Sequence, residues 1–141
     1  MANRLYTAFR EDMLDSSAPN LAVATIKAIL HDNGADTPDP TNDDFLNDVA
    51  PAARIAVSGA FTSVSVTGGV FDAADVTYTS VSGASVETII IYEDDGGVEA
   101  NSSLIAHIDT ATGLPFTPSG GNVTIQWDNG ANRIFKIGAG A

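Results

Sequence analysis

The sequence predicts an all-β fold, an antiparallel β-sandwich or jelly-roll-like domain with one short N-terminal helix. One observation behind this prediction is a series of about eight or nine short runs rich in β-branched and aromatic residues, separated by Gly, Asn, Asp and Pro turn signals at intervals of about 8–12 residues. A second is the alternation in residues 61–67, where Val64 and Val66 fall on one face and Ser63 and Ser65 on the other. A sheet with one apolar face has to cover it with another layer, which favours a sandwich.

The length of the chain favours a single β domain spanning residues 1–141. A chain of this size can bury roughly 68% of its unfolded surface, which is enough for a self-sufficient core. No internal repeat with a period of about 20–50 residues divides it further.

The first expected element is an amphipathic helix. Apolar side chains recur every four residues at Leu5, Phe9 and Met13, which predicts a helix over residues 4–15. Asn3 is expected to cap its N-terminus.

This helix has two interpretations, because amphipathic helices commonly cover a core but chain ends are also free to reach neighbours. In the second interpretation it is an arm that docks on another subunit. Leu5, Tyr6 and Phe9 are then the candidate subunit contacts, and the tail 138–141 is a second candidate arm.

Residues 22–30 are expected to form a strand, since Val23, Thr25, Ile26 and Ile29 are β-branched. A helix is the alternative, because short apolar runs are ambiguous.

The stretch 32–48 carries six aspartates and no basic residue, and it contains Pro38 and Pro40. It is interpreted as a solvated acidic loop, as charge runs usually are. A calcium site is the alternative, because several carboxylates can hold a hard cation, but the EF-hand spacing is absent. The ligands of such a site would be Asp36, Asp39, Asp43 and Asp44.

The middle of the chain is expected to hold four short strands and then a Ser/Gly-rich loop over residues 80–85. The strands are expected over residues 53–57, 61–67, 70–71 and 76–78.

The stretch 87–137 contains three strongly apolar runs and a shorter fourth. Each is bounded by turn chemistry such as Asp94-Asp95-Gly96-Gly97, so they are predicted to be consecutive antiparallel strands. These runs cover residues 88–92, 103–108, 123–127 and 134–137.

The charge distribution excludes several partners. The formal net charge is −12, and no basic residue occurs between Arg54 and Arg133, where nine acidic ones do. Direct binding to nucleic acid needs Lys and Arg to neutralise phosphates, so none is expected. An anionic membrane surface is disfavoured for the same reason. No apolar run approaches the ~20 residues of a membrane span, and the N-terminal residues lack the apolar core of a secretory signal.

The sequence predicts no enzyme. There is no cysteine, which excludes disulfides and thiolate chemistry, and none of the common catalytic motifs occurs. The histidines, His31 and His107, are far apart in sequence, and His107 lies in an apolar run where a structural role is the default. The carboxylates at 93–99 lie in a Gly-rich turn and are interpreted as a solvated hairpin tip. No catalytic residue, cofactor or metal ion is therefore expected.

Trp127 is the only tryptophan and precedes the turn signal Asp128-Asn129-Gly130. The structural interpretation is an anchor in the core or at a sheet edge. The alternative is a platform for stacking a sugar, which would make the domain a carbohydrate-binding β-sandwich.

Several stretches in order along the chain carry a resemblance to small virion proteins of tailed bacteriophages, of the head decoration or cement type. These are Arg4-Leu5-Tyr6, 25–30 (TIKAIL), 69–73 (GVFDA), 104–106 (LIA), 109–115 (DTATGLP) and 127–130 (WDNG). The resemblance implies a structural protein that binds the major capsid protein, as a trimer or dimer, and supplies no site residues.

The residues fit that implication in two ways. Only 17% of them are charged, and a surface rich in Thr, Ser and Val suits subunit contacts. The acidic balance favours the outside of a DNA-filled shell, since an acidic protein facing packed phosphate would be repelled. We therefore expect a protein that is made in the host cytoplasm and stabilises the capsid exterior. The alternative is a tail, neck or head-fibre component with a carbohydrate-binding β-sandwich.

Overall fold

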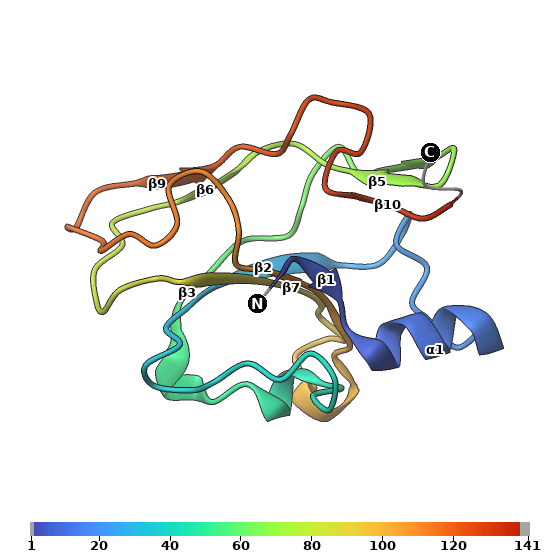
Figure 1. Cartoon of the computed structure of the whole chain (residues 1–141), viewed down its shortest axis with the longest axis horizontal. Helices are drawn as coiled ribbons and strands as arrows, with labels where there is room; N and C mark the ends of the chain where they lie inside the picture. Colours follow the sequence, from blue (N-terminus) through green and yellow to red (C-terminus); the bar gives the residue numbers. More distant parts are fainter. Residues whose placement is uncertain (1, 139–141) are drawn as a thin grey trace.

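A five-stranded antiparallel sheet lies at the centre of the molecule (Figure 1). The computed structural model describes residues 2–138. The strand order is β1-β8-β7-β2-β3. These strands are β1 (Arg4–Leu5), β2 (Ile26–His31), β3 (Arg54–Val57), β7 (Thr88–Glu93) and β8 (Leu104–Ile108).

Two smaller antiparallel sheets form a second layer on one face of the central sheet. Their strand orders are β10-β5-β4 and β6-β9. The all-β prediction is confirmed, and the layout is sandwich-like. The strands are β4 (Ser65–Thr67), β5 (Val70–Asp72), β6 (Val76–Tyr78), β9 (Val123–Ile125) and β10 (Phe135–Lys136).

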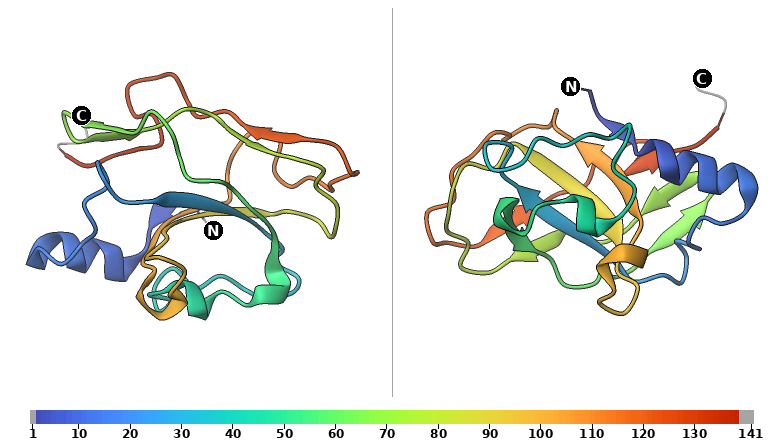
Figure 2. Two further views of the ribbon diagram at one scale, coloured as in Figure 1. Left: turned by 180° about the vertical axis from the view of Figure 1, so that it is seen from behind. Right: turned by 90° about the horizontal axis from the view of Figure 1, so that it is seen from below.

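The opposite face of the central sheet is covered by the segment 32–53 (Figure 2). This segment contains the 3₁₀ turns η1 (Leu46–Asp48) and η2 (Pro51–Ala53), and η3 (Glu99–Asn101) lies beside it. Covering on both faces explains why the two central strands are buried along nearly their whole length. Continuous apolar runs such as 88–92 are what a doubly covered strand requires.

The register of the central sheet decides which side chains share a face. Ile91 lies between Ala28 on β2 and Ala106 on β8, and this face meets the second layer. Ile90 lies between Ile29 and His107, and this face meets the segment 32–53.

The N-terminal helix is shorter than predicted. α1 spans Thr7–Asp15, because Arg4 and Leu5 pair with β8 as a strand before the helix begins. Asn3 is not the N-cap: its Oδ1 accepts hydrogen bonds from the backbone N–H groups of Asp109 and Thr110, at 2.9 and 2.8 Å. The polar side chain is therefore used to fix the start of the chain to the end of β8.

The acidic stretch 32–48 is a loop, but the prediction that it is simply solvated is wrong. Pro38, Pro40 and Leu46 are buried against the rest of the molecule. The backbone N–H of Thr7 donates to the carbonyl of Pro40 at 2.9 Å, and that of Leu46 donates to Ser102. The loop is therefore packed against the core and does not extend freely into solvent.

Strand pairing in the second half of the chain also differs from the prediction. β7 and β8 do form a consecutive antiparallel pair, but β9 pairs with β6 and β10 pairs with β5. The expected strand over 61–67 is reduced to β4, an edge strand whose Val66 is 50% exposed. All three residues of β4 are exposed, so its apolar alternation does not produce a buried face.

Candidate functional site

The candidate subunit contacts are largely committed to the core of the same chain. Tyr6 and Phe9 are 0% and 1% exposed, and the ring of Phe9 meets that of Phe135 edge-on at 6.5 Å. Leu5 is partly buried in β1. That this segment contacts other subunits stays a prediction; the large apolar side chain that α1 exposes is Leu14, at 89%. The tail 138–141 falls almost wholly outside the described residues.

Trp127 is an internal anchor. It is 8% exposed, its ring lies 5.6 Å from that of Phe61, and its Nε1–H donates to the carbonyl of Ala74 at 3.1 Å. Its backbone N–H donates to Asp75. With its ring packed and its one donor used, it presents no free face on which a sugar could stack.

The fold brings the two histidines onto one face of the central sheet. His31 pairs with Thr88 across β2 and β7, and His107 pairs with Ile90 across β7 and β8. Because residues two apart on a strand share a face, both imidazoles lie on the face under the segment 32–53. Sequence reasoning missed this, since only the register shows it.

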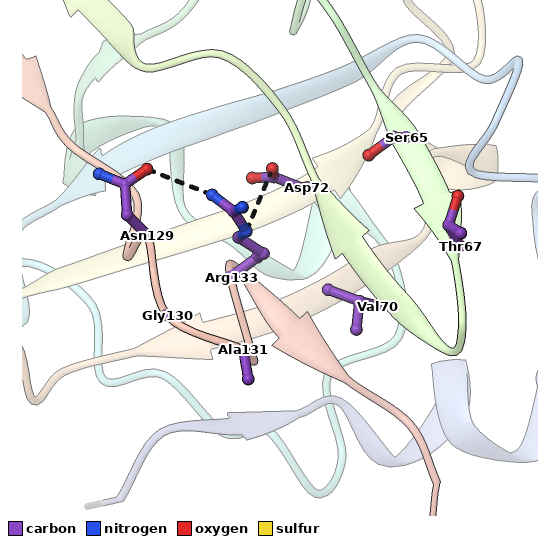
Figure 3. Close-up of a pocket in the computed structure, with 8 residues that line it drawn as sticks. All are labelled: Ser65, Thr67, Val70, Asp72, Asn129, Gly130, Ala131 and Arg133. Atoms are coloured by element: carbon purple, nitrogen blue, oxygen red, sulfur yellow. Dashed lines mark hydrogen bonds and ion pairs between the residues drawn. The ribbon is translucent and has the colours of Figure 1, made fainter.

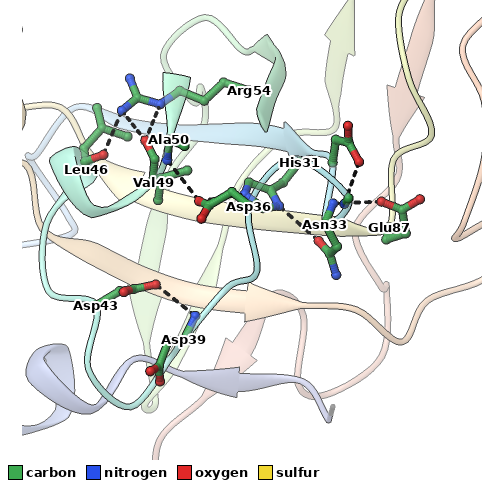
Figure 4. A network of polar contacts seen from close by, with 12 residues as sticks. His31, Asn33, Asp36, Asp39, Asp43, Leu46, Val49, Ala50, Arg54 and Glu87 are labelled. Carbon is green, nitrogen blue, oxygen red and sulfur yellow. Dashed lines mark hydrogen bonds and ion pairs between the residues drawn. The ribbon is translucent and has the colours of Figure 1, made fainter. Parts of the chain in front are cut away.

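Buried polar atoms gather in the same layer, which we call the polar seam. Four such side-chain atoms have no hydrogen-bond partner within residues 2–138: Tyr6 Oη, His31 Nε2, Thr88 Oγ1 and His107 Nδ1. His31 Nε2 lies 3.5 Å from Asp36 Oδ2, and its Nδ1 lies 3.0 Å from Asn33 Oδ1 (Figure 4).

Burial sets the protonation of this layer. It raises the pKa of Tyr6 well above the ordinary phenol value, and the carboxylates of Asp43, Asp36 and Asp39 add to the effect. It also lowers the pKa of His107, so the neutral imidazole is favoured. Tyr6 and His107 are therefore favoured in their neutral forms, and the loop that covers them is acidic.

The aspartates of the loop bind its own backbone rather than converging on one point. Asp36 accepts the N–H of Ala50 at 2.9 Å, and Asp43 accepts that of Asp39 at 2.9 Å (Figure 4). Asp48 accepts the N–H groups of Asp44 and Phe45. Across residues 2–138, no three His, Asp or Glu side chains are placed to hold one metal ion.

Arg54 fastens the same loop from the side. Its Nη2 donates to the carbonyls of Val49 and Leu46 at 2.6 and 2.8 Å, and its Nε donates to Val49 at 3.1 Å (Figure 4). Its Nη1 pairs with Glu99 Oε1 at 2.7 Å. Glu99 therefore ties the η3 turn to the loop, and its pKa is lowered by this hydrogen bond.

A polar hollow of about 480 Å³ lies beside β4 and β5 (Figure 3). Its charged side chains are Arg133 and Asp72, whose Nε and Oδ2 atoms are 3.7 Å apart. Arg133 also donates to Asn129 Oδ1 at 3.2 Å. The two charged groups at this hollow are engaged with each other and with Asn129, so they are not aimed at a ligand.

An apolar groove of about 330 Å³ lies between α1 and the β10-β5-β4 sheet. None of the described residues that line it is charged, and two of them are exposed large apolar residues: Val66 at 50% and Ile137 at 45%. Its lining includes Phe9, Met13, Pro19, Leu21, Phe71 and Phe135. Single exposed apolar residues are ordinary, but a group of them around a groove marks an interaction surface.

Comparison with models of known protein families gives no match, and comparison with curated protein sequences gives none either. Among residues 2–138, no helix has both the length and the apolar character needed to cross a bilayer.

Proposed function

We propose that this protein is a structural virion component, a decoration or cement protein that binds the outside of a tailed-phage head. The observation that carries the proposal is the apolar groove beside α1, where the side chains of Val66 and Ile137 are exposed. A rigid sandwich that offers such a surface is suited to holding a neighbouring protein. The resemblance of the sequence to head decoration proteins supplies the kind of neighbour.

The surface charge supports a position on the exterior of the shell. Three of the six basic side chains are neutralised within the chain, Lys27 by Asp94 at 2.6 Å, Arg54 by Glu99 and Arg133 by Asp72. The remaining surface is strongly acidic, and packed DNA on the inner side would repel it.

In this proposal each copy bridges subunits of the major capsid protein, as part of a trimer or dimer. A contact of standard size buries ~1,600 Å². Many copies on one shell then add their effects, because a copy that is already bound to one subunit meets the next subunit at a high effective concentration. The shell resists internal pressure better as a result.

The test is to count copies of the protein in purified particles by quantitative mass spectrometry. A decoration protein is expected at a multiple of the number of capsomers, and particles that lack it are expected to burst at lower temperature and milder osmotic shock. One or a few copies would place it in the tail or neck instead, and its absence from particles would end the proposal. A carbohydrate-binding role is not proposed, because the ring of Trp127 is buried.

A further inference from the structure

We propose that the apolar groove and an acidic hollow next to it form one site, which binds a segment of a partner protein with a large apolar side chain beside Lys or Arg. The inference rests on the proposed function only for the identity of the partner, which would be a neighbouring virion subunit. The chemistry of the segment follows from the two halves of the site.

The first half is the apolar groove. α1 supplies Phe9 and Met13 to one wall, and the small sheet supplies Phe71 and Phe135 to the other. The rings of Phe71 and Phe135 are stacked with centroids 5.2 Å apart, so this wall is rigid. A volume of about 330 Å³ without a charged lining residue selects an apolar side chain.

The second half is a hollow of about 450 Å³ in which three carboxylates stand, those of Asp12, Glu93 and Asp95. In the part of the chain that the structure describes, no Lys, Arg or His forms an ion pair with any of them. Burial raises the pKa of Glu93, and the nearby charges of Asp95 and Asp94 raise it further. A cation in this hollow would relieve the repulsion among these groups.

The two halves are joined by shared elements. Pro19 lines both, and α1 forms a wall of both, because Asp12 on this helix lies beside Met13 and one turn beyond Phe9. One short segment can therefore place an apolar side chain in the groove and a neighbouring Lys or Arg in the hollow.

Charge decides between a basic partner and a second copy of this chain. With a net charge of −12, a second copy would bring further carboxylates to a site that already has three without a cation. A basic segment gains from the same charges and is steered toward them.

The test uses the purified protein and three fluorescent synthetic six-residue peptides, read by polarisation. The first has a Leu-Leu centre with two Lys on each side, the second replaces every Lys by Glu, and the third replaces the two Leu by Ser. The first is expected to bind at least about tenfold more tightly than either of the others, because only it satisfies both halves.

Two variants with matched controls locate the binding. Val66→Asp places a charge in the groove, and its control Val57→Asp changes a residue of similar exposure (45%) on β3. The double variant Glu93→Gln/Asp95→Asn removes two charges from the hollow, and its control is Asp128→Asn. Each site variant is expected to weaken binding at least about fivefold, and the double variant to flatten the salt dependence, while the controls change neither.

Several results would overturn the inference. These are equal binding of the three peptides, no saturable binding of the first, or equal losses in the controls and the site variants. Self-association of the protein that Val66→Asp abolishes, together with no peptide binding, would assign the groove to a second copy instead. Because the assay needs no particle, its failure would remove this peptide site, while the copy count in particles would still test the proposed function separately. Absence of the protein from particles would remove the function and leave the peptide result standing.

Discussion

Replacing Arg54 by alanine is expected to loosen the loop that covers the central sheet. The guanidinium makes three hydrogen bonds of 2.6–3.1 Å to the carbonyls of Val49 and Leu46, and its side chain is only 12% exposed. Hydrogen bonds from a charged group are worth about 1.5–3 kcal/mol, and their loss leaves these carbonyls short of a donor. We expect Arg54→Ala to lower the free energy of unfolding by about 2–4 kcal/mol.

The ion pair with Glu99 accounts for little of this loss. The Glu99 side chain is 45% exposed, and exposed pairs are typically worth about 0.2–1 kcal/mol. Glu99→Gln is therefore the matched control, with an expected loss of at most about 1 kcal/mol. Arg54→Lys should behave like the alanine variant rather than the control, because one ammonium cannot reproduce a planar fork of donors.

The measurements are urea unfolding at pH 7 and hydrogen exchange of the amides in residues 32–53. Arg54→Ala should lower the urea midpoint and increase exchange selectively in this loop, with little change in β7. If Arg54→Ala and Glu99→Gln cost the same, or if exchange rises equally throughout the chain, the guanidinium does not fasten the loop and the reasoning is wrong.

Three further predictions concern buried groups and one turn. Tyr6→Phe removes a buried hydroxyl without a partner among the described residues and should lower the free energy of unfolding by less than about 0.5 kcal/mol. Tyr78→Phe removes a buried 2.8 Å hydrogen bond to the carbonyl of Ala28 and should lower it by about 1–2 kcal/mol. Equal losses of the two variants in urea unfolding would contradict this. The pKa of His107 is lower in the folded state, mainly because of burial, so the unfolded chain takes up this proton first as pH falls. The stability that His107 contributes is fully present above pH 6.5, the pKa of the unfolded chain, and is lost as the pH falls from there to the folded pKa. His107→Gln should therefore reduce the fall in stability between pH 7.5 and 5.5, and an unchanged slope would refute this reasoning. Gly69→Ala should destabilise the fold strongly, because φ is +78° and a Cβ would clash with the carbonyl oxygen of Ile137. Gly68→Ala, at φ +62°, has open space around its Cβ and should cost only the conformational strain. Equal melting temperatures of the two variants would refute this.

The local signals of the sequence were reliable guides to where strands lie. The runs 88–92 and 103–108 became β7 and β8, with bounds that differ by one residue at single ends. β-Branched residues between turn signals act through local preferences, so neighbouring residues carry most of this information. The helix was located for the same reason, although its first turn was displaced when Arg4 and Leu5 paired with β8.

The candidate site was much less accessible to sequence reasoning. Tyr6 and Phe9 lie in a predicted helix that could either cover the core or reach a neighbour. Both are buried, Tyr6 beside the aspartates of the loop 32–48 and Phe9 against Phe135 of the second layer. The groove is built from α1, β5 and β10, which are far apart in sequence. No local pattern states that Phe9 will meet Phe135, since their contact depends on how three sheets are packed.

By itself the sequence determined the composition of the fold: short strands, one helix, a strongly acidic charge and the absence of cysteine chemistry. The tertiary structure alone decided that β9 returns to β6 and β10 to β5, that both imidazoles share one face, and that the acidic loop serves as a cover. The physical reason is that strand propensity is set by adjacent residues, whereas pairing and register are set by which apolar faces can be buried together, and that choice is made over the whole chain at once.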